Sequence, residues 1–408
     1  MRPQAIYALL CLVALCCQAC RAPESEDDGP DASEAFERKV LQEDWQTADT
    51  GPWGTLLYRR FFLPLPEQWR NVAPNSQTPS WHVPKITPEK VNDLIATGPL
   101  TPEEKKLWLG TCKMEMESDG VIIHPSQEFR WALKPESRAL FYGWLSRFPQ
   151  NESLAYPLCY PASAQEEWFA HCDLRPELIG AIKHLTYPRG TSICFSDYDL
   201  LDEFLNSPEE RAELVTVLSR LPYCEVRIKL NKKTDISALA AYWGEWHRSE
   251  RVKSKLKSSL ADKQEAYMPI ASILPPLPRS LLNTYPAMRV DSATPPSNCT
   301  WTSLNFFNRT SDDRFVHPAE FEKAITQYHD VVQGTPRYGD ILVLKNENGR
   351  TVHVAVYLAA DFVYTKNGGH ETKPWVIMKL SELKAAYPSL SPLKESYHRW
   401  TPQKSKSS

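Results

Sequence analysis

The chain has 408 residues, of which 42% are hydrophobic and 24% charged, so most of it can fold around more than one hydrophobic core. Its formal net charge is −3 at pH 7, which excludes the globally basic surface of a nucleic-acid-binding protein. The 34 prolines and 13 tryptophans favour irregular, loop-rich packing over long helices.

The N-terminus has the features of an export signal. Arg2 supplies a positive charge, and the apolar stretch that follows is too short to cross a membrane as a helix. Residues 1–19 are therefore predicted to be a signal peptide. Ala19 followed by Cys20 resembles the processing site of bacterial lipoproteins, which predicts lipidation at Cys20, a location in the cell envelope and membrane attachment only through the lipid anchor. The alternative is plain cleavage near Ala19 or Ala22.

Residues 20–44 are predicted to be a flexible tether, because the acidic segment 24–37 has too few apolar side chains to fold. An oxidising compartment permits disulfides among the later cysteines. At most two bridges are expected, with the pairing open, because one of the six is needed as a thiol. No spacing of Cys and His is typical of zinc, so no metal or other cofactor is predicted. The six cysteines are Cys112, Cys159, Cys172, Cys194, Cys224 and Cys299.

Residues 45–175 form an irregular region rich in Trp and Pro, without repeat spacing. Its tryptophans are predicted to anchor cores and loops, with a carbohydrate-binding surface as the alternative. Thr101, followed by Pro102 and Glu104, predicts the start of a helix with a capping box.

Residues 176–268 are predicted to be a mostly helical domain. Ser207 and Asp235 are helix caps, each followed by an apolar face, and the alternating residues 224–230 predict a strand between the two helices. Residues 269–290 form a Pro-rich strap that no long helix can traverse. Because the strap is also apolar, it is predicted to pack between the middle domain and the last domain rather than to remain a free linker.

The last domain is predicted to span residues 291–400. Asn298 is suited to cap a helix, and Cys299 would then occupy its first turn. There the unpaired backbone N–H groups and the helix dipole would favour the thiolate and lower the pKa of the thiol. Taken alone, such a cysteine is more often a small packed residue.

Strands are predicted to follow this helix. Gly339 and Asp340 lead into a first apolar strand, and Asn348-Gly349 gives a hairpin turn. His353 then lies near the start of a second strand, and residues 362–367 predict a third. The segment is thus an antiparallel meander that follows a helix, which with the rest of the chain predicts an α+β protein.

This combination resembles the NlpC-type family of bacterial cell-wall cysteine peptidases, which have a reduced papain-like fold. In that family a nucleophilic cysteine opens a helix, a Gly-Asp strand comes next, and a strand of the form His-Val-Gly-Ile-Tyr follows. The corresponding residues here are Cys299, Gly339-Asp340-Ile-Leu-Val and His353-Val-Ala-Val-Tyr357. The resemblance covers about residues 291–390, a quarter of the chain.

The sequence departs from the family pattern in places. Trp301 stands where the family has glycine after the nucleophile, and Ala355 replaces another glycine. The third catalytic position, a polar residue on the next strand, is left open among several candidates. Asn367 is favoured because an amide oxygen can accept the second imidazole N–H, and Thr365 shares its strand face. Tyr364 fits the family alignment if the strand is bulged, and His370 is a further alternative.

The resemblance implies an exported peptidase or amidohydrolase without a cofactor. A Cys299–His353 dyad would cleave amide bonds in the stem peptides or crosslinks of peptidoglycan, so the expected partner is peptidoglycan or a peptide substrate and not nucleic acid. One alternative is a non-catalytic envelope lipoprotein that uses the same fold as a wall-binding module. Another is a transacylase that uses the same dyad.

Overall fold

A computed structural model describes residues 39–40, 44–70, 79–245, 247–287 and 296–401. The predicted signal peptide, Cys20 and most of the tether lie outside these residues. Helices alternate with antiparallel sheets throughout the described chain, which confirms the α+β class. None of the helices in these ranges is both long and apolar enough to cross a bilayer.

The first sheet joins segments that are far apart in the sequence. β3 (Thr55–Phe62) pairs with β10 (Tyr223–Asn231), and β10 pairs in turn with β11 (Glu265–Pro269). β1 (Lys39–Val40) and β2 (Gln46–Thr47) both pair with β3. Strands from the predicted tether, irregular region and helical domain thus share one sheet.

Local sequence signals for the elements of this region are confirmed. The helix capped by Thr101 is α4 (Pro102–Thr111), and its capping box is present. Ser207 caps α10 (Pro208–Ser219), and Asp235 caps α11 (Ile236–Trp243). These caps form because a side-chain oxygen accepts a backbone N–H that the first turn leaves without a partner.

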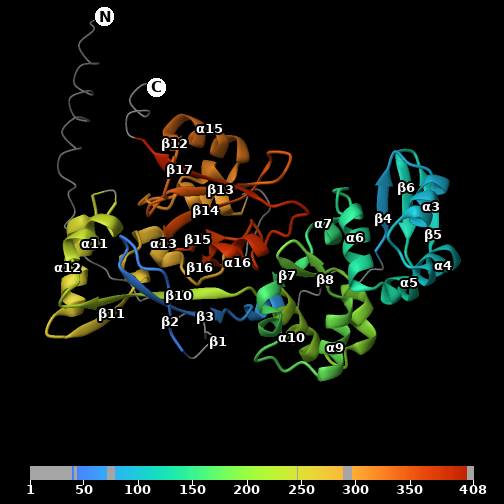
Figure 1. Ribbon diagram of the computed structural model, residues 1–408, viewed down its shortest axis with the longest axis horizontal. Coiled ribbons are helices and arrows are strands. Elements are labelled where there is room, and N and C mark those ends of the chain that lie inside the picture. Colours follow the sequence, from blue (N-terminus) through green and yellow to red (C-terminus); the bar gives the residue numbers. More distant parts are fainter. Residues whose placement is uncertain (1–38, 41–43, 71–78, 246, 288–295, 402–408) are drawn as a thin grey trace, which may run out of the picture.

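Two small sheets and several helices complete the part that precedes the C-terminal domain. In Figure 1 the β4-β6-β5 sheet lies at one end of the molecule and α11 and α12 at the other, with the C-terminal sheet between them. The strands are β4 (Trp81–Pro84), β5 (Lys113–Glu117), β6 (Gly120–His124), β7 (Leu158–Pro161), β8 (Tyr187–Arg189) and β9 (Ser192–Phe195). The helices are α2 (Glu67–Arg70), α3 (Pro88–Thr97), α5 (Gln127–Ala132), α6 (Pro135–Leu145), α7 (Glu152–Ala155), α8 (Gln165–Trp168), α9 (Pro176–Leu185) and α12 (Ser249–Leu260), with 3-10 turns at Ala162–Ala164 and Tyr198–Phe204.

The C-terminal sheet has the order β12-β17-β13-β14-β15-β16, and all neighbouring strands are antiparallel. The predicted meander is its centre, β13-β14-β15, and it follows α14 along the chain. The strands are β12 (His329–Val331), β13 (Ile341–Lys345), β14 (Thr351–Ala359), β15 (Phe362–Lys366), β16 (Trp375–Lys379) and β17 (Lys394–Trp400). The helices are α14 (Cys299–Leu304), α15 (Pro318–Tyr328) and α16 (Leu380–Ala385), with a 3-10 turn at Asp313–Val316.

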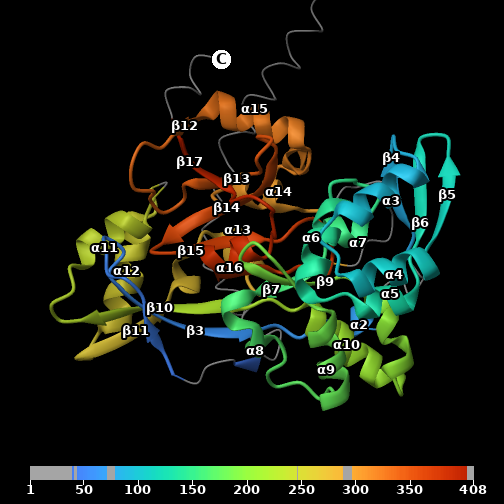
Figure 2. The same cartoon turned by 45° about the vertical axis from the view of Figure 1, so that its right-hand side comes forward.

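The strap packs as predicted. It forms a 3-10 turn, Ile270–Ile273, and then the short helix α13 (Pro276–Leu281), whose prolines lie where no backbone N–H is needed. Leu274 is buried in a core that also contains α11 residues and Val356 of the C-terminal sheet. Leu282 forms a parallel bridge with Trp375. The strap is therefore one of the contacts that join the middle of the chain to the C-terminal sheet (Figure 2).

The tryptophans of the irregular region are largely core residues. Trp81, Trp108 and Trp168 are at most 1% exposed, and the first two form edge-on contacts with Phe141. Their faces are therefore used for packing, and these three side chains are not available to bind carbohydrate.

Candidate functional site

Cys299 is the first residue of α14. The Asn298 side chain accepts the backbone N–H of Trp301 at 3.0 Å and donates to the Val316 carbonyl at 2.8 Å, so the predicted cap is present and is itself anchored. Cys299 is partly buried and packs beside Val354 of β14. The helix start thus lies against the strand that carries the predicted base.

His353 lies within β14 and is only 1% exposed. Its Nε2 is 2.7 Å from the Thr365 hydroxyl on β15, and its ring stacks on Tyr387 with centroids 4.4 Å apart and planes inclined by 28°. Nδ1 is buried and has no hydrogen-bond partner within the described part of the chain. Buried polar atoms are nearly always paired, so this nitrogen needs an explanation.

The structure gives Thr365, rather than the favoured Asn367, as the neighbour of the imidazole. Asn367 donates to the Met378 sulfur at 3.2 Å, and its side-chain oxygen is buried with no hydrogen-bond partner among the residues that the structure describes. The described β14–β15 pairs run from Phe362 to Tyr364, where Tyr364 is opposite Val356. Extending that register would place Asn367 opposite His353, but the imidazole bonds to Thr365, which is two residue pairs away.

The two alternative residues have other partners. The Tyr364 hydroxyl donates to the Pro278 carbonyl of the strap at 3.0 Å. The His370 ring pairs with the Thr372 hydroxyl at 2.8 Å. Neither bond involves His353, so Thr365 is the polar side chain that holds the ring.

Cys299 and His353 approach β14 from opposite sides. Side chains alternate along a strand, and the face with Val354 is covered by α14 and α15, whereas the face with Ala355 packs toward α16. Cys299 packs beside Val354, and the nearby backbone of Val354 counteracts the rise in the pKa of the thiol. Cys299 therefore lies against β14, next to the residue that follows His353. Because Nδ1 has no partner among the described residues, the two groups are not hydrogen-bonded in this conformation.

Burial keeps both groups neutral in this conformation. It lowers the pKa of His353 to about 3, so the imidazole is uncharged near pH 7. Burial also raises the pKa of Cys299, opposite to the direction predicted from its position in the helix. Backbone N–H groups and the charge of Lys366 counteract this rise but do not cancel it. Desolvation outweighs the helix terminus because the packing around Cys299, which is partly buried, removes much of the water that would support a charge on its sulfur.

Lys366 is a buried cation that the sequence did not point to. Its Nζ donates to the carbonyl oxygens of Gly368 and His370, at 2.9 Å each. Burial lowers its pKa to about 7, and a Cys299 thiolate would raise it. Lys366 is therefore positioned to respond to charge on Cys299.

A short segment that begins at the last residue of α16, residues 385–390, covers His353. It contains Tyr387 and is bound to the β7-β9 sheet. The Ser192 hydroxyl donates to the Ala385 carbonyl at 2.6 Å, and the Cys159 thiol donates to the Ala386 carbonyl at 3.6 Å. The sequence of this segment does not predict that it covers His353, because the residues that hold it in place lie about 200 positions earlier in the chain.

The Gly-Asp pair at the start of β13 has a structural role. Gly339 has φ +91°, and a Cβ there would lie 2.5 Å from the ring of Phe307. Asp340 is buried and forms a two-point ion pair with Arg399 of β17, at 2.8 and 2.6 Å. It also accepts the Arg337 backbone N–H at 2.7 Å. The pair therefore fixes the entry into the sheet and does not contact His353.

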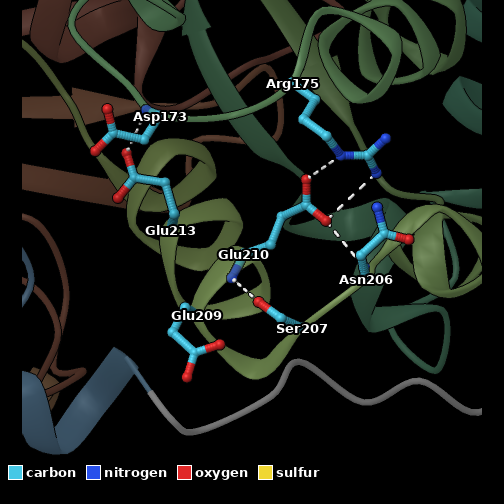
Figure 3. Close-up of a pocket in the computed structure, with 7 residues that line it drawn as sticks. All are labelled: Asp173, Arg175, Asn206, Ser207, Glu209, Glu210 and Glu213. Atoms are coloured by element: carbon cyan, nitrogen blue, oxygen red, sulfur yellow. Dashed lines mark hydrogen bonds and ion pairs between the residues drawn. The ribbon is translucent and has the colours of Figure 1, made fainter.

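A surface hollow lies elsewhere, at the start of α10 (Figure 3). Glu210 accepts the Arg175 guanidinium at 2.7 Å and the Asn206 backbone N–H at 2.9 Å, while its own N–H donates to Ser207. These bonds lower the pKa of Glu210 and satisfy the helix terminus. The hollow contains none of the predicted site residues, and its polar groups serve helix capping.

One group in the described ranges could hold a metal ion, namely His82, Glu117 and Asp119. His82 Nε2 is 3.2 Å from the Asp119 carboxylate, and both acids are exposed. The group lies on the β4-β6-β5 sheet, which is not part of the predicted site.

The chain was compared with family models, curated proteins and solved structures, and it matches none of them.

Proposed function

We propose that the chain is a cysteine hydrolase in which Cys299 attacks an amide carbonyl, His353 is the base and Thr365 positions the imidazole. The observation that carries this proposal is the state of His353. One ring nitrogen is held by Thr365, and the other is buried without a partner beside the strand residue that contacts Cys299. Leaving a buried polar atom unpaired costs about 1–3 kcal/mol, which a purely structural histidine would have no reason to keep.

The bond to Thr365 selects the useful tautomer. If the Thr365 hydroxyl accepts Nε2–H, the lone pair is left on Nδ1. In a conformation that brings the ring and the sulfur to the same side of β14, this lone pair can take the proton of the Cys299 thiol. The thiolate then attacks the carbonyl, and the imidazolium protonates the departing amine. Water hydrolyses the resulting thioester. The backbone N–H groups at the start of α14 counteract the rise in the pKa of Cys299, so the first turn of α14 can also support negative charge on the acyl oxygen.

The arrangement of elements supports the papain-like assignment. A helix that begins with the cysteine packs on a sheet whose central strands run in the order Gly-Asp strand, histidine strand, third strand. This is the order expected from the NlpC-type resemblance, and it motivates the choice of substrate. We propose amide bonds of peptidoglycan stem peptides or crosslinks, acted on by an exported, lipid-anchored enzyme.

The proposal requires a second conformation. In the described one, Tyr387 covers His353 and both reacting groups are neutral. Moving the 385–390 cover would admit water, which would raise the pKa of His353 and lower that of Cys299 toward their ordinary values. The described conformation is thus a latent state of the enzyme.

The test is hydrolysis of defined stem peptides, followed as release of new amino groups. Cys299→Ala and His353→Ala should each lower the rate roughly 10²- to 10⁴-fold. The double variant should lose no more than either single one, because the pair acts as a unit. Cys172→Ala, at another partly buried cysteine, is the matched control and should keep the wild-type rate. Full activity in Cys299→Ala would exclude the mechanism.

The second candidate is a non-catalytic envelope module, which the closed cover favours. A thiol reagent distinguishes the two, because only the enzyme needs a conformation in which Cys299 is reachable. A transacylase would need the same conformation and an amine acceptor, so adding acceptor amines to the assay would divert the product from acid to amide.

A further inference from the structure

Two cysteines lie directly opposite each other in the β7-β9-β8 sheet. Cys159 of β7 pairs with Cys194 of β9 in antiparallel register, and both side chains belong to the same buried cluster. The other described cysteines have no such neighbour, since Cys224 pairs with Arg60 and the remaining three lie outside the strands.

The sheet pattern identifies the type of this pair. The backbone N–H of Ala162 donates to the Thr191 carbonyl, so positions alternate from there between hydrogen-bonded and non-hydrogen-bonded pairs. Pro161, which has no N–H, falls on a non-hydrogen-bonded position, and Cys159 and Cys194 are the next pair of that type.

Such a pair suits a disulfide. Cα atoms of a non-hydrogen-bonded antiparallel pair are about 4.5 Å apart, and disulfides span Cα separations of about 4.4–6.8 Å. Both side chains point to the same face of the sheet, where Cys159 is 9% exposed and Cys194 is fully buried. The backbone would not need to move far to bring the sulfurs together.

We propose that Cys159 and Cys194 are a disulfide-forming pair, oxidised as the chain folds in an environment that contains a small-molecule disulfide. The two thiols release two protons and pass two electrons to the oxidant, which is reduced to two thiols, and one S–S bond forms in the protein. In the folded protein, burial raises the pKa of Cys159 to about 11 and that of Cys194 further, which suppresses the reactive thiolates. We therefore expect the thiol–disulfide exchange to take place during folding, before the pair is buried.

The bridge would fix the surface on which the 385–390 cover is docked. Ser192, two residues before Cys194, donates to the Ala385 carbonyl. Cys159 itself donates to the Ala386 carbonyl as a thiol, a bond that the disulfide form gives up. The link joins β7 to β9 across residues 160–193, so it would restrict the unfolded chain and stabilise the folded one.

Peptide mapping tests the pair directly. The full chain is refolded with oxidised and reduced glutathione, quenched with iodoacetamide in denaturant and digested without reductant. A linked Cys159–Cys194 peptide should be the main disulfide product, with Cys112 and Cys224 alkylated. Recovery of both cysteines as alkylated thiols, or of each bridged to a different cysteine, would overturn the proposal.

Thermal unfolding gives a second readout. Reductant should lower the Tm of the oxidised wild type by roughly 5 °C. Cys194→Ala should unfold at the same temperature with and without reductant, whereas the control Cys224→Ala should keep the wild-type difference. A reductant effect that survives in Cys194→Ala, or one that is absent from the wild type, would contradict the bridge. The wild-type measurements decide the question even if a variant does not fold.

Discussion

His353 owes its properties to side chains from two other elements. Thr365 on β15 bonds Nε2, and Tyr387 beyond α16 stacks on the ring, while the next residue of β14, Val354, packs beside Cys299. Burial then removes its charge near neutral pH. One ring nitrogen of His353 is therefore held by Thr365, the other has no partner among the described residues, and the ring is kept from water.

Thr365→Val tests the orientation. The change keeps the shape of the side chain and removes the hydroxyl, which leaves Nε2 buried without its described partner. We expect a loss of about 1–3 kcal/mol in the free energy of unfolding and a fall in hydrolysis. The measurements are urea unfolding and the stem-peptide assay.

Asn367→Ala is the matched control for this variant. Asn367 lies two residues further along and bonds Met378 instead of His353. It should keep most of the activity. Equal losses in the two variants would mean that Thr365 has no special role at the imidazole.

The stability of the protein should depend on pH through His353. Its pKa is about 3 in the folded state and about 6.5 in the unfolded state, so between these values the unfolded chain binds a proton that the folded chain does not. The free energy of unfolding should therefore fall as pH drops through this window, by up to about 1.4 kcal/mol per pH unit from this group.

His353→Gln isolates this contribution. The carboxylates titrate in both proteins and therefore cancel in the difference in unfolding free energy between wild type and variant. This difference should be constant above pH 7 and should shrink between pH 6 and pH 4, where only the wild type loses stability through His353. Parallel curves across the whole range would show that His353 is exposed or already charged in the folded state.

At the scale of elements, the 385–390 cover lies between two parts of the chain. Ser192 and Cys159 of the β7-β9 sheet hydrogen-bond to the cover, and Tyr387 of the cover stacks on the ring of His353. Few hydrogen bonds hold the segment, so its opening should be less costly than global unfolding. The cover is thus the element that decides access to the candidate site.

Tyr387→Ala should uncover the site. Tyr387 covers His353 and is also close enough to Cys299 for a charge on that sulfur to raise the pKa of Tyr387. Because an aromatic contact is worth about 0.5–1.5 kcal/mol beyond the area it buries, its removal should accelerate alkylation of Cys299 by iodoacetamide at least roughly 2- to 10-fold. The rate is read by mass spectrometry of the Cys299 peptide. Tyr397→Ala is the control, because Tyr397 stacks on Tyr357 and not on His353. An unchanged rate in Tyr387→Ala would show that something else limits access to Cys299.

At the scale of the whole molecule, a buried ion network fastens the C-terminal domain to the earlier chain. Arg60 of β3 pairs with Glu382 of α16 at 2.8 Å and with Glu167 of α8 at 2.5 Å. Burial raises the pKa of Glu382 to about 7, and the charge of Arg60 opposes this rise. Since α16 leads directly into the cover, this network sets the position of the cover.

Arg60→Met removes the positive charge and leaves the carboxylates of Glu167 and Glu382 without the cation that they share. We expect a loss of about 3–5 kcal/mol in the free energy of unfolding, because unpaired buried charge is costly. Arg59→Met is the matched control. Arg59 precedes Arg60 in β3, is more exposed and pairs with Glu225, so its loss should cost about 1 kcal/mol or less. Denaturant unfolding of both variants gives the comparison, and equal losses would argue against a fastening role for Arg60.

The sequence alone determined the local elements. Caps and strands depend on side chains within a few residues of each other, which is why the Asn298 cap, the helix after Ser207 and the β13-β14-β15 meander are found where the pattern predicts them. The sequence also singled out Cys299 and His353. The sequence indicated Thr365 only as the second choice. The alternation of side chains predicts which residues share a face of β15, but it does not predict which of them lies beside His353.

Only the tertiary structure decided the environment of the candidate site. The pairing of β3 with β10 joins segments that the sequence assigns to different regions, because sheet partners are chosen by long-range packing. The same packing brings Tyr387 onto His353 and buries Cys299, and desolvation then overrides the effect of the helix terminus on the thiol pKa. The candidate groups follow from the sequence, whereas their charge and accessibility depend on tertiary contacts such as that of Tyr387 with His353. The segment that carries Tyr387 is in turn held by Ser192, 193 positions before Ala385.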